Sequence, residues 1–161
     1  MSRIRIGHGY DVHALSAGDG LVLGGVTIAC EFSVIAHSDG DVLIHALCDA
    51  LLGAIGRGDI GGMFADTDPV NKDRDSREFL RHIHALMEAE CVRLGNADLT
   101  IVAEAPKMQT YIPAMKNIIA SDLNTEVTRL NIKATTTEKL GFTGRQEGIA
   151  VHAVVLVEQD K

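Results

Sequence analysis

Apolar and polar residues alternate at the start of the chain, which is the pattern of a strand with one covered face. Ile4 and Ile6 lead into Gly7-His8-Gly9, where we expect the strand to break into a flexible turn. Two short apolar runs, residues 21–23 and 26–28, flank Gly24-Gly25. Paired glycines between apolar runs are typical of a hairpin, because its turn requires positive φ. The N-terminal segment is therefore predicted to form a strand followed by a hairpin.

Two helices are expected next, separated by a long loop. Ser38 or Asp39 can cap a first helix that runs to about Ile55. The sequence Asp75-x-x-Glu78 is a variant of the capping box and predicts the start of a second helix, which Gly95 ends. The segment between these helices is rich in glycine and aspartate, so we expect a loop that is long enough to be functional.

The C-terminal half is predicted to contain strands and one more helix. Strands are expected at residues 99–103, 130–134 and 149–157, with a helix from Pro113 to about Leu123. This order of elements predicts one α/β domain over residues 1–161, an α+β sandwich in which helices cover one face of a mixed β-sheet. The last strand is apolar except for His152, which indicates that the other sheet face is covered too.

The composition points to a protein that assembles. Hydrophobic residues make up 46% of the 161 residues, yet aromatic residues only 4%, so the apolar surface is mostly aliphatic and exceeds what one subunit is expected to bury. The net charge of −7 disfavours nucleic acid and anionic membranes as partners. No run of 18 apolar residues and no signal peptide are found, and three cysteines without a C-x-x-C pair indicate a reducing, cytoplasmic location.

Candidate metal ligands come from two segments. Asp11-x-His13 places two side chains on one face of a strand, and His45 lies on the predicted first helix. That helix contains no Lys, Arg, Glu or Gln, although these residues normally coat an exposed helix face. Two histidines and one carboxylate with an open position form the pattern of a catalytic zinc site. Asp11, His13 and His45 are therefore predicted to bind zinc.

Several alternatives remain open at this point. The Asp11-x-His13 triplet alone is also typical of an ordinary turn. Asp41 and Asp49, one turn on either side of His45, are candidate acceptors for the far N–H groups of the histidines. Cys48 is either a competing zinc ligand or a core residue.

Two further segments suit an anionic substrate. His37-Ser38 precedes the first helix, where free N–H groups favour phosphate, although Ser38 also suits ordinary capping. Residues 135–138 offer three threonine hydroxyls for phosphate and one carboxylate for a hard ion such as Mg²⁺, although this is also a normal strand end. The sequence lacks the P-loop, G-x-S-x-G and G-x-G-x-x-G motifs, which disfavours nucleotide triphosphatases, serine hydrolases and dinucleotide enzymes.

Several long segments, in order along nearly the whole chain, resemble the 2-C-methyl-D-erythritol 2,4-cyclodiphosphate synthase family. They are Gly7-His8-Gly9-Tyr10-Asp11-Val12-His13, Ala36-His37-Ser38-Asp39-Gly40-Asp41, Gly58-Asp59-Ile60-Gly61, Asp66-Thr67-Asp68-Pro69, Ala105-Pro106-Lys107-Met108 and residues 133–145. The resemblance implies a homotrimer with sheets packed inward and active sites between neighbours. It implies that the 2-phosphate of 4-diphosphocytidyl-2-C-methyl-D-erythritol 2-phosphate attacks the β-phosphorus and releases CMP, in the non-mevalonate isoprenoid pathway.

The same resemblance implies roles for individual residues. Asp11, His13 and His45 match zinc ligands, Glu138 matches the ligand of Mg²⁺ or Mn²⁺, and His37 and Thr136 match the residues that stabilise the transition state. Phe142 and Arg145 match positions near a central cavity that holds an isoprenoid diphosphate in some members. The implied substrate contacts are Asp11, Val12, His13, His37, Ser38, Asp59, Ile60, Gly61, Phe64, Ala65, Asp66, Thr67, Asp68, Ala103, Glu104, Ala105, Pro106, Lys107, Met108, Gln109, Thr135, Thr136, Thr137, Glu138, Phe142 and Arg145.

The chain departs from the family pattern at Tyr10, where Phe is common, and at Ala65, where Pro is common. Neither position is an expected metal ligand. Two rival functions fit some of the same residues. One is a zinc-dependent phosphohydrolase that releases phosphate, and the other is a non-catalytic trimer that binds an isoprenoid diphosphate.

Overall fold

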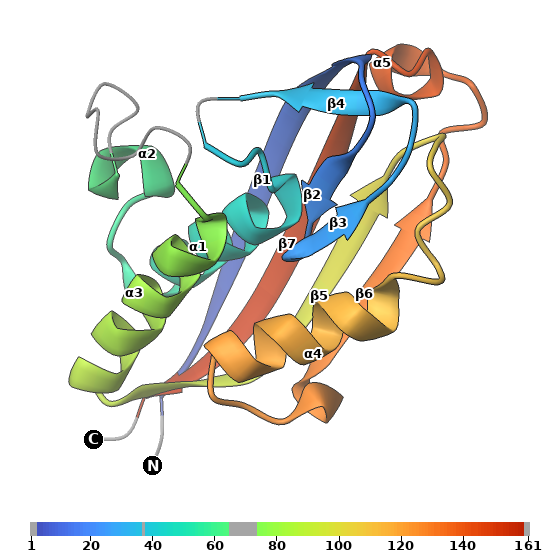
Figure 1. Cartoon of the computed structure of the whole chain (residues 1–161). Coiled ribbons are helices and arrows are strands. Elements are labelled where there is room, and N and C mark those ends of the chain that lie inside the picture. The colour runs from blue at the N-terminus through green and yellow to red at the C-terminus, as the bar shows by residue number, and fades with distance from the viewer. Residues whose placement is uncertain (1–2, 37, 65–73, 160–161) are drawn as a thin grey trace.

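A five-stranded mixed sheet forms the centre of the fold in this computed structural model, which describes residues 3–36, 38–64 and 74–159. The strand order is β4-β1-β7-β5-β6, and all neighbours are antiparallel except β5 and β6 (Figure 1). The strands are β1 (Arg3–Ala17), β4 (Phe32–Ile35), β5 (Val92–Val102), β6 (Leu130–Thr135) and β7 (Gly148–Gln159).

Three main helices lie on one face of this sheet, as expected (Figure 1). They are α1 (Val42–Ile55), α3 (Ser76–Ala89) and α4 (Ile112–Asp122), and the predicted hairpin of β2 (Leu21–Leu23) and β3 (Val26–Ile28) lies on the same side. Short helical turns are α2 (Ile60–Met63), η2 (Val127–Arg129) and α5 (Gly141–Gly144). Among the described residues, no helix is long and apolar enough to cross a membrane.

The first strand does not break at Gly7-His8-Gly9, and that prediction is wrong. β1 continues through both glycines to Ala17 because they allow α1 to lie directly on the strand. A Cβ atom on Gly7 would lie 1.8 Å from the carbonyl oxygen of Ala50, and one on Gly9 would lie 1.9 Å from that of Ala46. The glycines therefore permit close packing between a helix and a strand.

Other predicted boundaries shift where tertiary contacts decide them. The N-cap of α1 is Asp41, not Ser38 or Asp39, and its buried carboxylate also accepts hydrogen bonds from the N–H groups of Gly24 and Gly25 in the hairpin turn. The second long helix ends at Ala89, whereas Gly95 lies inside β5 at a shift in register. β4 and the short helix α2 were not predicted.

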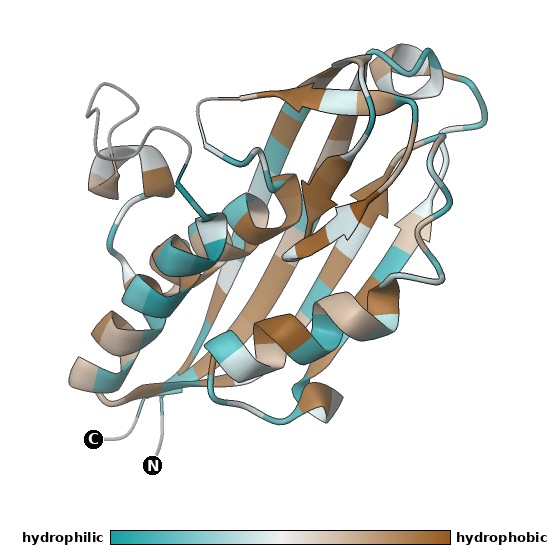
Figure 2. Ribbon diagram, viewed as in Figure 1, coloured by the Kyte–Doolittle hydropathy of each residue, from teal (hydrophilic) through white to brown (hydrophobic). Residues whose placement is uncertain are grey.

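None of the described residues covers the other face of the sheet. Ile6 is 70% exposed and Val154 is 45% exposed, and Ile4 and Tyr10 lie on the same face. The strands are hydrophobic along much of their length, although helices cover only one side of them (Figure 2). We expected both faces of β7 to be covered. Among the described residues of one chain, only the face toward the helices is covered.

We expect Gly9→Ala to destabilise the fold, because the new methyl group meets the backbone of α1 rather than a side chain that can move. The free energy of unfolding should fall by at least about 1–3 kcal/mol, the usual cost of overpacking. Urea denaturation measures the change. Gly53→Ala on α1 is the matched control, since no atom packed against this part of the helix lies within 4 Å of its added Cβ. Equal stability of the two variants would contradict the close-packing role of Gly9.

Candidate metal centre and active site

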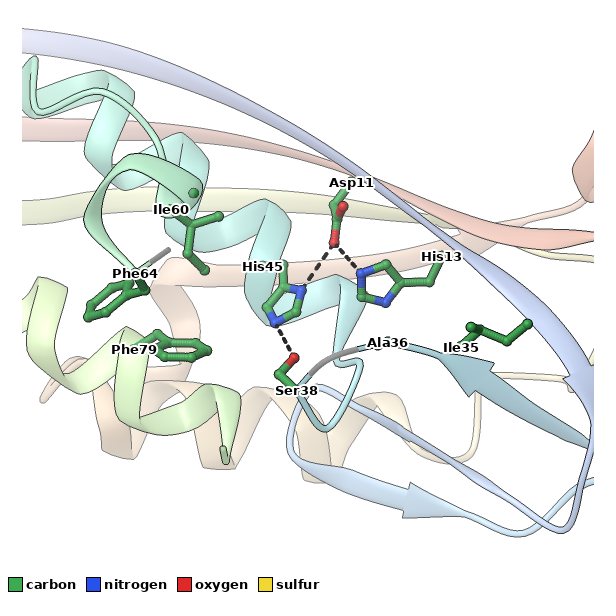
Figure 3. A pocket seen from close by; sticks show the side chains of 10 residues that line it. Asp11, His13, Ile35, Ala36, Ser38, His45, Ile60, Phe64 and Phe79 are labelled. Carbon is green, nitrogen blue, oxygen red and sulfur yellow. Dashed lines mark hydrogen bonds and ion pairs between the residues drawn. The ribbon is translucent and has the colours of Figure 1, made fainter. Parts of the chain in front are cut away.

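Three of the predicted ligands meet where β1 passes the first turns of α1. Asp11 and His13 project from the helix-covered face of β1, and His45 projects from α1 toward them (Figure 3). Asp11 Oδ2 lies 3.2 Å from His13 Nε2 and 3.2 Å from His45 Nδ1. All three ligand atoms lie within 4.8 Å of one another. The sequence prediction that these residues form one cluster is confirmed.

Hydrogen bonds on the far side of each ring fix which nitrogen faces the cluster. The carbonyl oxygen of Gly40 lies 2.9 Å from His13 Nδ1, and a carbonyl can only accept, so Nδ1 carries the proton. Ser76 Oγ lies 2.7 Å from His45 Nε2 and donates its own hydrogen to Asp39. It therefore accepts from Nε2–H. Both imidazole lone pairs consequently point toward the carboxylate of Asp11, as in a metal site with oriented ligands.

The negative charge of Asp11 between two imidazole nitrogens favours a bound cation. Burial alone would raise the pKa of Asp11, but its interactions with His13 and His45 outweigh burial and hold that pKa far below its ordinary value. Burial likewise opposes charge on His13, yet the hydrogen bond and charge of Asp11 raise its pKa. A divalent metal ion fits this donor set.

The structure resolves the open alternatives around the cluster. Cys48 is fully buried, and burial raises the pKa of its thiol, so it is a core residue. Asp41 caps α1, and Asp49 accepts a hydrogen bond from the N–H of Ile60, so neither is the acceptor for a histidine ring. Ser76 takes that role for His45. The sequence could not predict the role of Ser76, because this residue lies on α3, which is distant from His45 along the chain.

A pocket of about 300 Å³ opens beside the cluster. Besides Asp11 and His13, four residues expected to contact substrate line it: Ser38, Ile60, Gly61 and Phe64. Ile35, Ala36 and Phe79 also line it and were missed, since apolar residues carry no chemical signal in the sequence. Asp59 caps α2 through the N–H of Gly62 and so fixes the turn that bears Ile60 and Gly61.

Residues 103–109 and 135–138 are the other segments predicted to contact substrate. They meet where β5 and β6 end, at the edge of the sheet away from β1. The N–H of Ala103 donates to the carbonyl oxygen of Thr135, which joins residues 103–109 to residues 135–138. Glu104 Oε1 accepts hydrogen bonds from the N–H groups of Thr137 and Lys139, both at 3.1 Å. These bonds hold Glu138 and Lys139 at positive φ, 54° and 65°. Thr136 Oγ1 donates to Glu138 Oε1 at 3.2 Å.

Side chains within these segments differ in their surroundings. Met108 is only 3% exposed and packs in the core, whereas Lys107 and Gln109 are exposed. Val12 lies between Asp11 and His13 but projects to the open face of the sheet. Phe142 lies on α5, and Arg145 just after it forms an ion pair with Glu147.

Within one chain, the Asp11 cluster and its pocket form one group of site residues, and residues 103–109 and 135–138 form a second group. The two groups do not meet. Two strands, β7 and β5, separate β1 from β6, so the groups are about 14 Å apart at usual strand spacing. Of the described residues that line the pocket beside the metal cluster, none belongs to 103–109 or 135–138. His37, Ala65, Asp66, Thr67 and Asp68 lie outside the described residues.

Sequence comparison places this fold and site in a known family. The model of the YgbB family matches residues 4–158. The chain is 60% identical to a 2-C-methyl-D-erythritol 2,4-cyclodiphosphate synthase of Pseudomonas fluorescens over 156 residues, which are 97% of this chain and 99% of the relative. The chain therefore belongs to the YgbB family, that of the 2-C-methyl-D-erythritol 2,4-cyclodiphosphate synthases.

Solved structures agree with this assignment. The bifunctional IspDF from Campylobacter jejuni is 42% identical with a TM-score of 0.95, and the match covers all of this chain and 44% of that one. A CDP complex of IspF from Plasmodium falciparum is 34% identical with a TM-score of 0.87, and the match covers 98% of this chain and 97% of that one. The fold is thus shared over the whole described chain.

We expect metal affinity at the Asp11 cluster to fall as pH decreases, starting at a higher pH than for an ordinary imidazole. A protonated His13 cannot bind metal, and its pKa is raised in the folded chain. Asp11→Asn removes the charge that raises this pKa, so its pH midpoint should move lower while its affinity at high pH is weaker. Chelator competition with Zn²⁺ across pH measures both effects. Identical midpoints would show that Asp11 does not control His13.

Proposed function

We propose that the chain converts 4-diphosphocytidyl-2-C-methyl-D-erythritol 2-phosphate to 2-C-methyl-D-erythritol 2,4-cyclodiphosphate and CMP. It is a lyase of the non-mevalonate isoprenoid pathway. The 2-phosphate attacks the β-phosphorus, a P–O bond forms, and the bond to the CMP oxygen breaks. The observation that carries the proposal is the oriented Asp11, His13 and His45 cluster beside a pocket in a member of this family.

The metals proposed are zinc at this cluster and Mg²⁺ or Mn²⁺ at Glu138. Two neutral imidazoles and one carboxylate suit zinc, whereas a single exposed carboxylate suits a hard ion shared with phosphate oxygens. Bound metal would neutralise and orient phosphate oxygens. The reaction is intramolecular, so correct positioning supplies much of the rate enhancement.

Different segments of the chain are proposed to position different parts of the substrate. Asp59, Ile60 and Gly61 are proposed to contact the methylerythritol part, which is supported by Ile60 and Gly61 lining the pocket beside the Asp11 cluster. The loop held by Glu104 presents Thr136 and Glu138 to phosphate, and His37 is proposed to stabilise the transition state together with Thr136. Residues 103–109 are proposed to bind cytidine, and the CDP complex of the Plasmodium falciparum relative supports nucleotide binding in general. Because Met108 is buried, exposed groups of this segment are the ones available to the base.

The complete site is proposed to form between subunits of a homotrimer. Two observations support this arrangement: the two groups of site residues lie apart on one sheet, and the open sheet face exposes the apolar side chains of Ile4, Ile6 and Val154. A cyclic trimer lets one part of each subunit face the other part of its neighbour. Phe142 and Arg145 then lie near a central cavity for an isoprenoid diphosphate. The unpaired cysteines further favour a cytoplasmic location.

Incubation with the diphosphocytidyl substrate, Zn²⁺ and Mg²⁺ should release CMP and cyclic diphosphate in equal amounts, measured by phosphorus NMR and chromatography. The 2-phosphate is held beside the β-phosphorus, so cyclisation outcompetes water. Release of inorganic phosphate would instead indicate a phosphohydrolase. Binding of an isoprenoid diphosphate without turnover would indicate a non-catalytic trimer.

Mixed trimers test whether the site is shared. We expect Asp11→Asn and Glu138→Gln to be inactive alone, because each damages one part of the site. Co-expressed in equal amounts, they should regain about one quarter of wild-type activity, since that share of interfaces pairs two intact parts in a cyclic assembly. Steady-state turnover of the co-purified mixture measures this, and separately purified variants mixed without exchange are the control. No recovery in verified mixed trimers would place the whole site within one chain.

A further inference from the structure

A pair of histidines lies on the open face of the sheet, away from the Asp11 cluster. His8 on β1 and His152 on β7 occupy diagonal positions, because His8 is opposite Val154 and His152 is opposite Tyr10. Along β1, Asp11 faces the helices, whereas His8 faces the open side. His8 Nε2 and His152 Nδ1 are 3.3 Å apart.

The spacing of these two nitrogens suits a metal ion better than a hydrogen bond. An N–H donor usually lies about 2.9–3.0 Å from its acceptor, so 3.3 Å is long for such a bond. Two nitrogens bound to a tetrahedral ion at about 2.0–2.1 Å lie about 3.3–3.4 Å apart. The separation at the Asp11 cluster, 3.2 Å between ligand atoms, is similar.

The surroundings of the pair leave both rings available. Among the described residues, the two rings hydrogen-bond only to each other. Tyr10 packs against His152 with ring centroids 4.7 Å apart, which holds that ring in place. The nearest charged groups across the face on β5 and β6, Asp98 and Lys133, are paired with each other, so neither a free cation nor a free carboxylate opposes the rings.

We propose that His8 and His152 form a second metal site, a two-imidazole chelate for a borderline transition cation such as Zn²⁺, Co²⁺ or Ni²⁺. Imidazole is the preferred side-chain ligand for these ions, and water completes the coordination. The ring orientations are set before the ion arrives, which lowers the entropic cost of binding. Both ligands come from one chain, so the site does not depend on the proposed reaction. In the proposed homotrimer this sheet face packs inward, so the pair would face the neighbouring subunits.

Calorimetric titration of the chelator-stripped protein with Zn²⁺ tests this site. The wild type should show two binding events per chain. Asp11→Asn should weaken one of them, and His8→Gln or His152→Gln should abolish the other. Retention of the Asp11 event in the His8 and His152 variants reports that they remain folded. The matched control is His84→Gln, which removes an imidazole on α3 that faces Glu88.

Three results would overturn the proposal: a single event in the wild type, two events in both His8→Gln and His152→Gln, or loss of the second event in His84→Gln. Diffraction at the zinc absorption edge provides a second readout on zinc-soaked crystals. An anomalous peak between His8 Nε2 and His152 Nδ1 is expected, and a crystal with a peak only at the Asp11 cluster would contradict the site. Turnover plays no part in either readout, so failure here leaves the proposed reaction unaffected.

Discussion

The close approach of β1 and α1 determines where the functional groups meet. Gly7 and Gly9 contribute no side-chain atoms to this contact, and Ala46 and Ala50 on the facing side of α1 contribute only methyl groups. Asp11 continues the same face of β1 beyond these glycines, so it reaches His45 on α1. Larger residues at the glycine positions would push the helix outward and separate the ligands. The cluster of Asp11, His13 and His45 therefore depends on the close packing of β1 and α1.

A second contact sets the position of α1 along β1. The buried carboxylate of Asp41 accepts hydrogen bonds from Gly24, Gly25 and Ile44, which ties the hairpin turn to the first turn of the helix. The preceding residue, Gly40, then presents its carbonyl oxygen to His13. Burying a carboxylate is costly unless its oxygens are hydrogen-bonded, and three N–H donors satisfy this one. One buried side chain thus links the hairpin, the helix start and the orientation of a metal ligand.

The sequence was informative where the chemistry has a fixed spacing. Asp11-x-His13 and His45 on a helix without long polar residues were enough to predict that these three side chains cluster, and alternation predicted the main strands. Gly7 and Gly9 were misread because glycine serves both turns and close packing, and only the partner helix decides between them. Ser76 was not foreseeable, since its contact with His45 spans distant segments. The N-cap of α1 was misplaced because Asp41 is selected by a tertiary contact as well as by the helix.

The strand β1 serves both faces of the sheet, and this links metal binding to assembly. Gly7, Gly9 and Asp11 face the helices, whereas Ile6, His8 and Tyr10 face the open side. Each part of the site is ordered within the single chain: Gly40 and Ser76 orient the rings on one side, and Glu104 holds the loop of Glu138 on the other. Groups that are already ordered lose little further freedom when subunits meet. The apolar side chains of the open face can therefore supply association energy to the proposed trimer, while the helix-covered face determines whether the proposed metal ligands are in place. A displacement of β1 by a change on either face would be transmitted to the other through its backbone.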